Sequence, residues 1–254
     1  MELLPNLLRD LPRGVVTDVR IGIHWTAVCI QSGGKEKCGL ASTLQPAHEH
    51  TGIPDVPEAG RLQGMPGEEL ASFCMDKDHP TLCSLGMAAL NALLLVDEES
   101  IKEVNAEEIL GNFGDQQVVL VGHFPFVKQL RYKLKKLIVL ELNPGPDDLP
   151  AEDAPILIPT ASVVAITGMT LLNHTLEGLL ELCQPSATVM VLGPTTPLDR
   201  RLFDYGIDIL SGAVVSNIQE VLNAVSQGGN FKQVNRAGLQ LATFVRPGLV
   251  LPHG

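Results

Sequence analysis

The chain has 254 residues and a formal net charge of −11, and it is 45% hydrophobic but only 4% aromatic. This is the composition of an aliphatic globular protein with enough residues to bury a sizeable core, which excludes fibrous and disordered classes. The acidic balance predicts no nucleic-acid partner, because a phosphate backbone would be repelled.

The sequence carries no sign of a membrane or secreted protein. No stretch reaches the roughly eighteen apolar residues that a membrane span needs, and no apolar signal core follows a basic N-terminus. The five cysteines are an odd number without a C-x-x-C pair, which predicts free and mostly buried thiols in a reducing compartment. We therefore expect a cytoplasmic protein without membrane insertion.

Strands come first along the chain. Residues 15–31 are rich in β-branched side chains and alternate in polarity, which predicts one strand with Gly22 as a bulge. The glycine pair at 33–34 predicts a hairpin turn, and residues 37–41 form the returning strand. An irregular stretch from about residue 43 to 67 follows, and a loop of this length is typical of a functional or disordered segment.

Three helices are expected next: one at 67–74, one at 80–95, and a weaker one that Ser100 caps and that runs through Asn105 to Leu110. The second is nearly all apolar, so we expect it to be buried. Its small residues would let another backbone approach closely; they are Gly86, Ala88, Ala89 and Ala92. This packing fits either a single chain or a homodimer, and both alternatives stay open.

From about residue 116 the pattern changes to strands that alternate with helices. Strands are predicted at 118–121, 136–142, 163–167, 188–192 and 207–210. Helices are predicted at 125–135, 170–182, 197–205 and 217–227. The strands are runs of Val, Ile and Leu, which is typical of a parallel sheet covered on both faces.

These elements predict an α/β protein with two domains, divided into residues 1–113 and 114–254. A parallel sheet with right-handed crossovers gathers its ligand beyond the carboxyl ends of its strands. In this sequence those ends carry small or polar residues, a composition suited to close backbone approach. They include Gly122, His123, Phe124, Glu141, Thr167, Gly193, Thr195, Thr196, Ser211 and Gly212.

Two prolines further support a binding site at these strand ends. Pro125 and Pro197 each suit the first position of a helix. The residues before them would then lie at a helix N-terminus, whose free N–H groups favour an anion or a carbonyl oxygen. A histidine placed there, such as His123, is favoured as a neutral acceptor or metal ligand, although it could simply bond a neighbouring carbonyl.

Glu141 follows Gly122 at nearly the spacing that a dinucleotide fold uses for the acid that receives ribose hydroxyls. An ordinary surface acid is the alternative. His174 interrupts an apolar helical stretch, which indicates either packing or a polar contact near the cleft. No nucleophile and base can be paired from the sequence.

A second set of residues has metal-ligand chemistry. His48 and His50 lie in the long loop, and Cys74, His79 and Cys83 surround the start of the second helix. These residue types suit zinc or a softer metal, but their spacing matches no recognised zinc motif. Coincidence is the simpler explanation.

Several strings resemble a known family, described as "putative heavy-metal chelation". They are Gly122-His-Phe-Pro125, Leu140-Glu141, Asp148-Leu-Pro150, Gly193-Pro-Thr-Thr-Pro-Leu198, Leu210-Ser-Gly212 and, in the first part, Gly86-Met-Ala-Ala-Leu-Asn91. The resemblance implies a small α+β domain like the N-terminal domain of enolase, followed by a Rossmann-like domain. It also implies a binding site in the cleft between these two domains. Genes of this family often lie near genes for metal or cofactor transport.

The resemblance assigns ten residues to that cleft: Asn91, Gly122, His123, Phe124, Glu141, Thr167, Gly193, Thr195, Thr196 and Pro197. Three functions follow as hypotheses. The first is binding or processing of a transition-metal ion or a metal-chelating small molecule, with His123 and Glu141 as metal ligands. The second is an enzyme with a nucleoside-containing cofactor such as S-adenosylmethionine. The third is a non-catalytic partner of a transport system.

Overall fold

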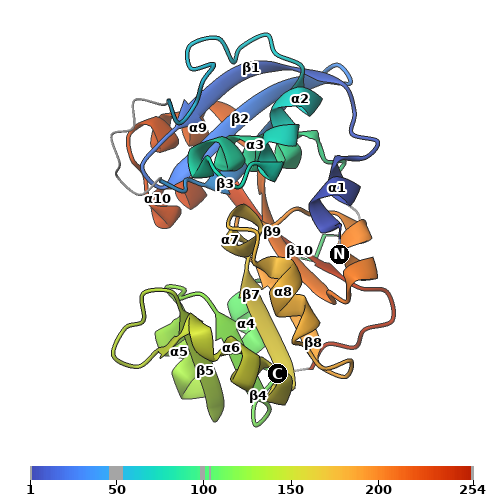
Figure 1. The fold of residues 1–254 in the computed structure, drawn as a ribbon, viewed down its shortest axis with the longest axis vertical. Helices are drawn as coiled ribbons and strands as arrows, with labels where there is room; N and C mark the ends of the chain where they lie inside the picture. The colour runs from blue at the N-terminus through green and yellow to red at the C-terminus, as the bar shows by residue number, and fades with distance from the viewer. Residues whose placement is uncertain (1, 46–53, 98–100, 103, 253–254) are drawn as a thin grey trace.

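The computed structural model describes residues 2–45, 54–97, 101–102 and 104–252. Two sheets organise this part of the chain (Figure 1): a three-stranded sheet in the order β1-β2-β3 and a seven-stranded sheet in the order β10-β9-β8-β7-β4-β5-β6. The fold is therefore mixed α/β, as predicted. None of the helices in the described residues has the length and apolar character of a membrane span.

The small sheet is antiparallel and consists of β1 (Gly14–Ile21), β2 (Trp25–Ser32) and β3 (Lys35–Ser42). The prediction of one strand over 15–31 was wrong, because the chain reverses where the Gly22 amide donates to the Trp25 carbonyl at 2.8 Å. Helix packing demands the glycine there: a Cβ on Gly22 would lie 2.3 Å from the Val225 carbonyl oxygen.

One face of the small sheet packs on α2 (Gly67–Ser72) and α3 (Pro80–Leu93), and η1 (Phe73–Met75) packs against both helices. As predicted, α3 is buried and its small residues admit other backbones. A Cβ on Gly86 would lie 2.0 Å from the Cys74 nitrogen. The short helix α1 (Leu3–Leu8), which was not predicted, packs beside η1.

The other face of the small sheet is covered by helices from the far end of the chain. These are α9 (Ile218–Ser226) and α10 (Phe231–Arg236), which Figure 1 shows beside β2 and β3. Their apolar residues form one cluster with Trp25, Ala27 and Cys29 of β2. The small sheet is therefore a middle layer between helices of both halves of the sequence.

The large sheet is built from β4 (Gln117–Val121), β5 (Lys136–Glu141), β6 (Leu149–Pro150), β7 (Val163–Thr167), β8 (Thr188–Leu192), β9 (Ile209–Val215) and β10 (Leu239–Val245). From β6 across to β9, every neighbouring pair is parallel. The order is that of a doubly wound Rossmann sheet, whose switch point falls between β4 and β7. β10 was not predicted and runs antiparallel to β9.

Both faces of the large sheet are buried, which explains its apolar strands. Alternate residues of β4 belong to different core clusters: Val118 and Leu120 face one side, Val119 and Val121 the other. The first side carries α4 (Ala106–Gly111) and α5 (Val127–Lys133). The second side carries α6 (Ala154–Leu157), α7 (Met169–Leu172) and α8 (Leu176–Glu181), with the 3-10 turns η3 (Ala151–Asp153) and η4 (Ile158–Thr160) beside α6.

Several predicted helices have different limits. The helix predicted at 170–182 is two helices, separated at His174, whose φ is +57°. The Asn173 side chain causes the break, since it accepts from the amide and the hydroxyl of Thr175 and so competes with the helical hydrogen bonds. Asn105 caps α4, and Ser100 lies outside the described residues.

Neither proline starts a helix. Helix α5 begins at Val127, two residues after Pro125. After Pro197, the Asp199 side chain caps a 3-10 helix, η5 (Arg200–Tyr205), by accepting from the Arg201 amide. The proposed anion sites at these helix starts were therefore misplaced, because the N–H groups belong to later residues.

Candidate functional site

The carboxyl edge of the large sheet has two glycines that follow strands in left-handed conformations. Gly122 follows β4 with φ +101°, and Gly193 follows β8 with φ +109°. The Phe124 ring lies against both: a Cβ on Gly122 would be 3.5 Å from its Cε2 atom, and a Cβ on Gly193 would be 3.8 Å from its Cε1 atom. The protein's own aromatic ring thus lies where a ligand would approach the two glycines.

Gly122 also contacts Thr167, which ends β7 on the other side of the switch point. A Cβ on Gly122 would lie 3.0 Å from the Thr167 Cβ and Cγ2 atoms. The neighbouring Gly168 approaches Thr196, whose Oγ1 atom would be 2.7 Å from a Cβ there. The structure therefore brings Gly122, Phe124, Thr167 and Gly193 together, with Thr196 close by.

His123 projects from the same turn and is held by two acids. Its backbone amide donates to a Glu141 carboxylate oxygen at 2.7 Å, and its Nδ1 atom lies 2.7 Å from an Asp148 carboxylate oxygen. The Glu141 carboxylate also accepts from the Leu142 amide at 2.8 Å. Glu141 thus fixes the backbone of the turn, whereas Asp148 fixes the imidazole ring.

Asp148 is the buried member of this group. Its side chain is 3% exposed, against 52% for His123 and 31% for Arg131. Arg131 Nη2 donates to the second carboxylate oxygen of Asp148 at 3.0 Å, and the Gly145 amide donates to the first at 3.2 Å. A buried carboxylate with three donors is compensated, so it can stay ionised beside the imidazole.

The pKa of Asp148 reflects this balance. Burial alone would raise the pKa, but the hydrogen bonds from His123 and Gly145 and the charges of His123 and Arg131 outweigh burial and lower it. Because an ionised carboxylate can only accept, the His123 ring donates its proton from Nδ1. Its Nε2 atom has no hydrogen-bond partner in the part of the chain that the structure describes. That is the arrangement of a histidine that binds a metal ion or takes up a proton.

Two other predicted site residues join the sheets to each other. The Thr195 hydroxyl accepts from the Ser42 amide at 3.0 Å and lies 3.1 Å from the Ser42 hydroxyl. Asn91 of α3 donates to the Thr195 carbonyl at 3.1 Å and to the Leu40 carbonyl at 2.9 Å. Thr195 is only 2% exposed, so in this structure these residues join β3 and α3 to the segment after β8. Their role in ligand binding stays a prediction.

In the second set of metal-type residues, Cys74 and Cys83 are neighbours, since the Cys83 thiol donates to the Cys74 carbonyl at 3.3 Å. Within the described part of the chain, no three His, Cys, Asp or Glu side chains are arranged to hold a metal ion. Burial raises the pKa of the Cys74 and Cys83 thiols to about 12, and His79 pairs with Asp76 at 3.1 Å. His48 and His50 lie outside the described residues.

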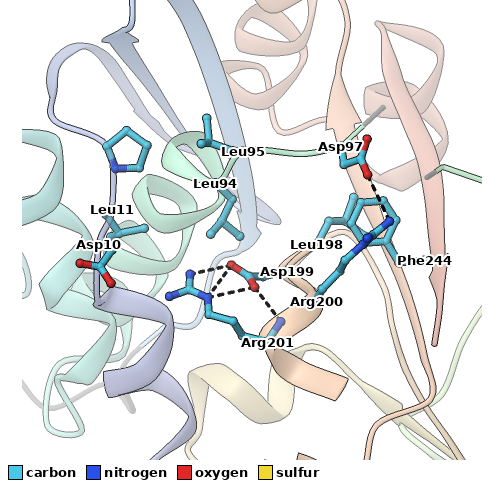
Figure 2. A pocket seen from close by; sticks show the side chains of 11 residues that line it. Asp10, Leu11, Leu94, Leu95, Asp97, Leu198, Asp199, Arg200, Arg201 and Phe244 are labelled. Atoms are coloured by element: carbon cyan, nitrogen blue, oxygen red, sulfur yellow. Dashed lines mark hydrogen bonds and ion pairs between the residues drawn. The ribbon is translucent and has the colours of Figure 1, made fainter. Parts of the chain in front are cut away.

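A pocket of about 240 Å³ lies between residues from the first 113 positions of the chain and residues from the later positions (Figure 2). Asp10, Leu94 and Asp97 contribute from the first part, and Leu198, Arg201 and Phe244 from the second. None of the ten predicted residues lines this pocket. Arg201 is committed to structure there, because it pairs with Asp199 and donates to the carbonyls of Asn6, Leu7 and Arg9 at the end of α1.

Sequence reasoning missed part of the His123 site. Asp148 appeared only within a string that resembles the family, and Arg131 appeared only inside the helix predicted at 125–135. The spacing of Arg131 and Asp148 in the sequence does not indicate that they meet at His123. The contact forms only because α5 and the segment after β5 pack together in the fold. Ser42 was missed because a serine at the end of a strand is common.

The fold belongs to the mixed α/β class, with a Rossmann-like sheet flanked by helices and a smaller antiparallel sheet. The chain belongs to the family described as "Putative heavy-metal chelation". One family model of that description matches residues 5–94 and a second matches residues 105–243.

Individual proteins are also similar to this chain. The chain is 26% identical to the uncharacterized protein MJ0500 of Methanocaldococcus jannaschii over 217 residues, which cover 82% of this chain and 81% of that protein. It also shares its fold with two solved structures of proteins with unknown function from the DUF364 family. The one from Desulfitobacterium hafniense has a TM-score of 0.82 at 24% identity, covering 96% of this chain and 98% of that one. The one from Pyrococcus horikoshii has a TM-score of 0.79 at 19% identity, covering 96% and 97%.

Proposed function

We propose that the protein binds a transition-metal ion that is already held by a small chelating molecule, with His123 Nε2 as a ligand supplied by the protein. The observation that carries the proposal is the 2.7 Å contact between His123 Nδ1 and the buried Asp148 carboxylate. Histidines that bind metals commonly donate their other ring N–H to a carboxylate, which fixes the tautomer and makes the free nitrogen more basic. The family description agrees with this chemistry.

A metal chelate fits better than a bare ion. No group of three potential ligand side chains is present among the described residues. The two nearby carboxylates, Glu141 and Asp148, already accept hydrogen bonds from the backbone amides of His123, Leu142 and Gly145. A single exposed imidazole holds a hydrated ion weakly, but it can complete the coordination of a metal whose other positions are filled by a chelator. Glu141 then acts by holding the turn and not as a first ligand.

The nucleoside alternative has less support. A ribose at Glu141 would compete with the His123 and Leu142 amides for the carboxylate. A dinucleotide phosphate would also have to displace the Phe124 ring from Gly122 and Gly193. No observation on the described residues favours a partner from a transport system, and that expectation stays a prediction.

The test uses protein without a purification tag and Ni²⁺-nitrilotriacetate, a chelate that keeps positions open for imidazole. Isothermal titration should give one site per chain for the wild type, and His123→Ala should abolish it. His24→Ala is the matched control, because His24 is also exposed but has no carboxylate within hydrogen-bonding distance among the described residues. Equal binding by wild type and His123→Ala, or loss only in His24→Ala, would refute the proposal.

A further inference from the structure

Two cysteines of the small sheet lie directly opposite each other. Cys29 of β2 and Cys38 of β3 are partners in the antiparallel register. Both side chains point to the face covered by α9 and α10, where Cys29 is fully buried and Cys38 packs at the edge of the same cluster. The metal site proposed above does not involve them.

The register brings the two cysteines especially close. The turn between β2 and β3 consists of Gly33 and Gly34, with φ +59° and +79°, and such a two-residue turn closes on a hydrogen-bonded pair, Ser32 with Lys35. Hydrogen-bonded and non-hydrogen-bonded pairs then alternate along the hairpin. Cys29 and Cys38 are the third pair after the closing pair, so they form a non-hydrogen-bonded pair, in which the Cα atoms are about 4.5 Å apart.

This separation lies within the range that a disulfide bridges, about 4.4–6.8 Å between Cα atoms. The neighbouring Cys29 thiol and burial raise the pKa of Cys38 well above its usual value, so only a small thiolate fraction is available and the exchange is run in alkaline buffer. Cys38 is half-buried, so a small reagent can reach it, whereas Cys29 is reached only through Cys38.

We infer that Cys29 and Cys38 form a redox-sensitive dithiol that closes to a cross-strand disulfide when it meets a low-molecular-weight disulfide such as glutathione disulfide. The Cys38 thiolate attacks one sulfur of the reagent, whose S–S bond breaks and releases one glutathione. Cys29 then loses its proton and attacks the Cys38 sulfur, which releases the second glutathione. Two protein thiols are oxidised and one glutathione disulfide is reduced to two thiols.

The other cysteines offer an internal comparison. Cys183 is half-buried at the end of α8, and its nearest polar contact is the Leu179 carbonyl. It can at most form a mixed disulfide with glutathione, because no second thiol is placed beside it among the described residues. Cys74 and Cys83 are completely buried on the opposite side of the small sheet, so the reagent reaches neither in the folded protein.

The experiment exposes the folded, reduced protein to glutathione disulfide, quenches with acid, and counts free thiols after unfolding. For the wild type we expect the five thiols to fall to three, or to two where Cys183 also carries a glutathione. Apart from that adduct, the intact mass should fall by two hydrogen atoms. A proteolytic map should then contain a peptide pair joined through Cys29 and Cys38. Cys183→Ser should still form this pair.

Cys38→Ser and Cys38→Ala should form no internal disulfide under the same conditions. Retention of all five thiols in the wild type, or a map that joins any other two cysteines, would overturn the inference. The wild-type map decides the question without any variant, so a folding defect in a Cys38 variant cannot obscure the result.

Discussion

His123 Nδ1 and a carboxylate oxygen of Asp148 lie 2.7 Å apart, although 25 residues separate them in the chain. The contact joins the turn after β4 to the segment before β6, on the edge where a doubly wound sheet binds its ligands. The buried carboxylate orients an exposed imidazole, and this relationship leads to the first two predictions.

Asp148→Asn should weaken chelate binding without removing the ligand atom. An amide accepts the Nδ1 proton less strongly than a carboxylate does, so Nε2 becomes a weaker donor and the ring is held less firmly. Loss of such a partner typically lowers metal affinity by about 10- to 100-fold. Titration with Ni²⁺-nitrilotriacetate measures this loss. An unchanged dissociation constant would mean that Asp148 serves stability alone.

Asp148 should also make stability depend on pH in the acid range. Because its pKa is lower in the folded chain than its ordinary value, the unfolded state binds more protons below that value. The stabilisation is fully present above about pH 4 and is lost as the pH falls through the folded pKa. Urea unfolding from pH 6 down to pH 2 should therefore show a steeper fall in the free energy of unfolding for wild type than for Asp148→Asn. If the free energy of unfolding fell equally with pH in both proteins, the lowered pKa of Asp148 in the folded chain would be contradicted.

Thr195→Val and Thr196→Val should differ although the residues are neighbours and both are 2% exposed. The Thr195 hydroxyl accepts from the Ser42 amide, and valine leaves that amide without its acceptor, at a cost of about 1–3 kcal/mol. The Thr196 hydroxyl is buried without a partner among the described residues, so valine there should be neutral or stabilising. Equal effects on the free energy of unfolding would argue that the contact between Thr195 and Ser42 does not stabilise the protein.

Gly122→Ala should destabilise the protein more than Gly193→Ala. Both glycines have left-handed backbones, which cost an alanine about 1–2 kcal/mol. Only at Gly122 would the new Cβ also crowd another residue, since it would lie 3.0 Å from Thr167. Denaturant unfolding of the two variants measures the difference. If Gly193→Ala lowered the free energy of unfolding more than Gly122→Ala, the Thr167 side chain would have moved aside to accept the new Cβ atom.

The large sheet could be predicted from sequence because its strands are short apolar runs that alternate with amphipathic helices. Four of the five predicted strands closely match β4, β5, β7 and β8. The fifth, predicted at 207–210, starts later and extends as β9 to Val215. β10 escaped notice because its central part, Gln240–Thr243, mixes exposed and buried positions at the edge of the sheet.

The candidate site was only partly predictable. Strand ends placed Gly122, His123 and Thr167 on one edge, since parallel strands bring their carboxyl ends together. The sequence by itself therefore determined the α/β class, the apolar layers and the edge that carries the polar turns, because all of these follow from local periodicity. Only the tertiary structure decided that Asp148 and Arg131 meet at His123, that Thr195 joins the two sheets, and that α9 and α10 cover the small sheet. These contacts link residues far apart in the chain, and no local pattern encodes which surfaces will meet.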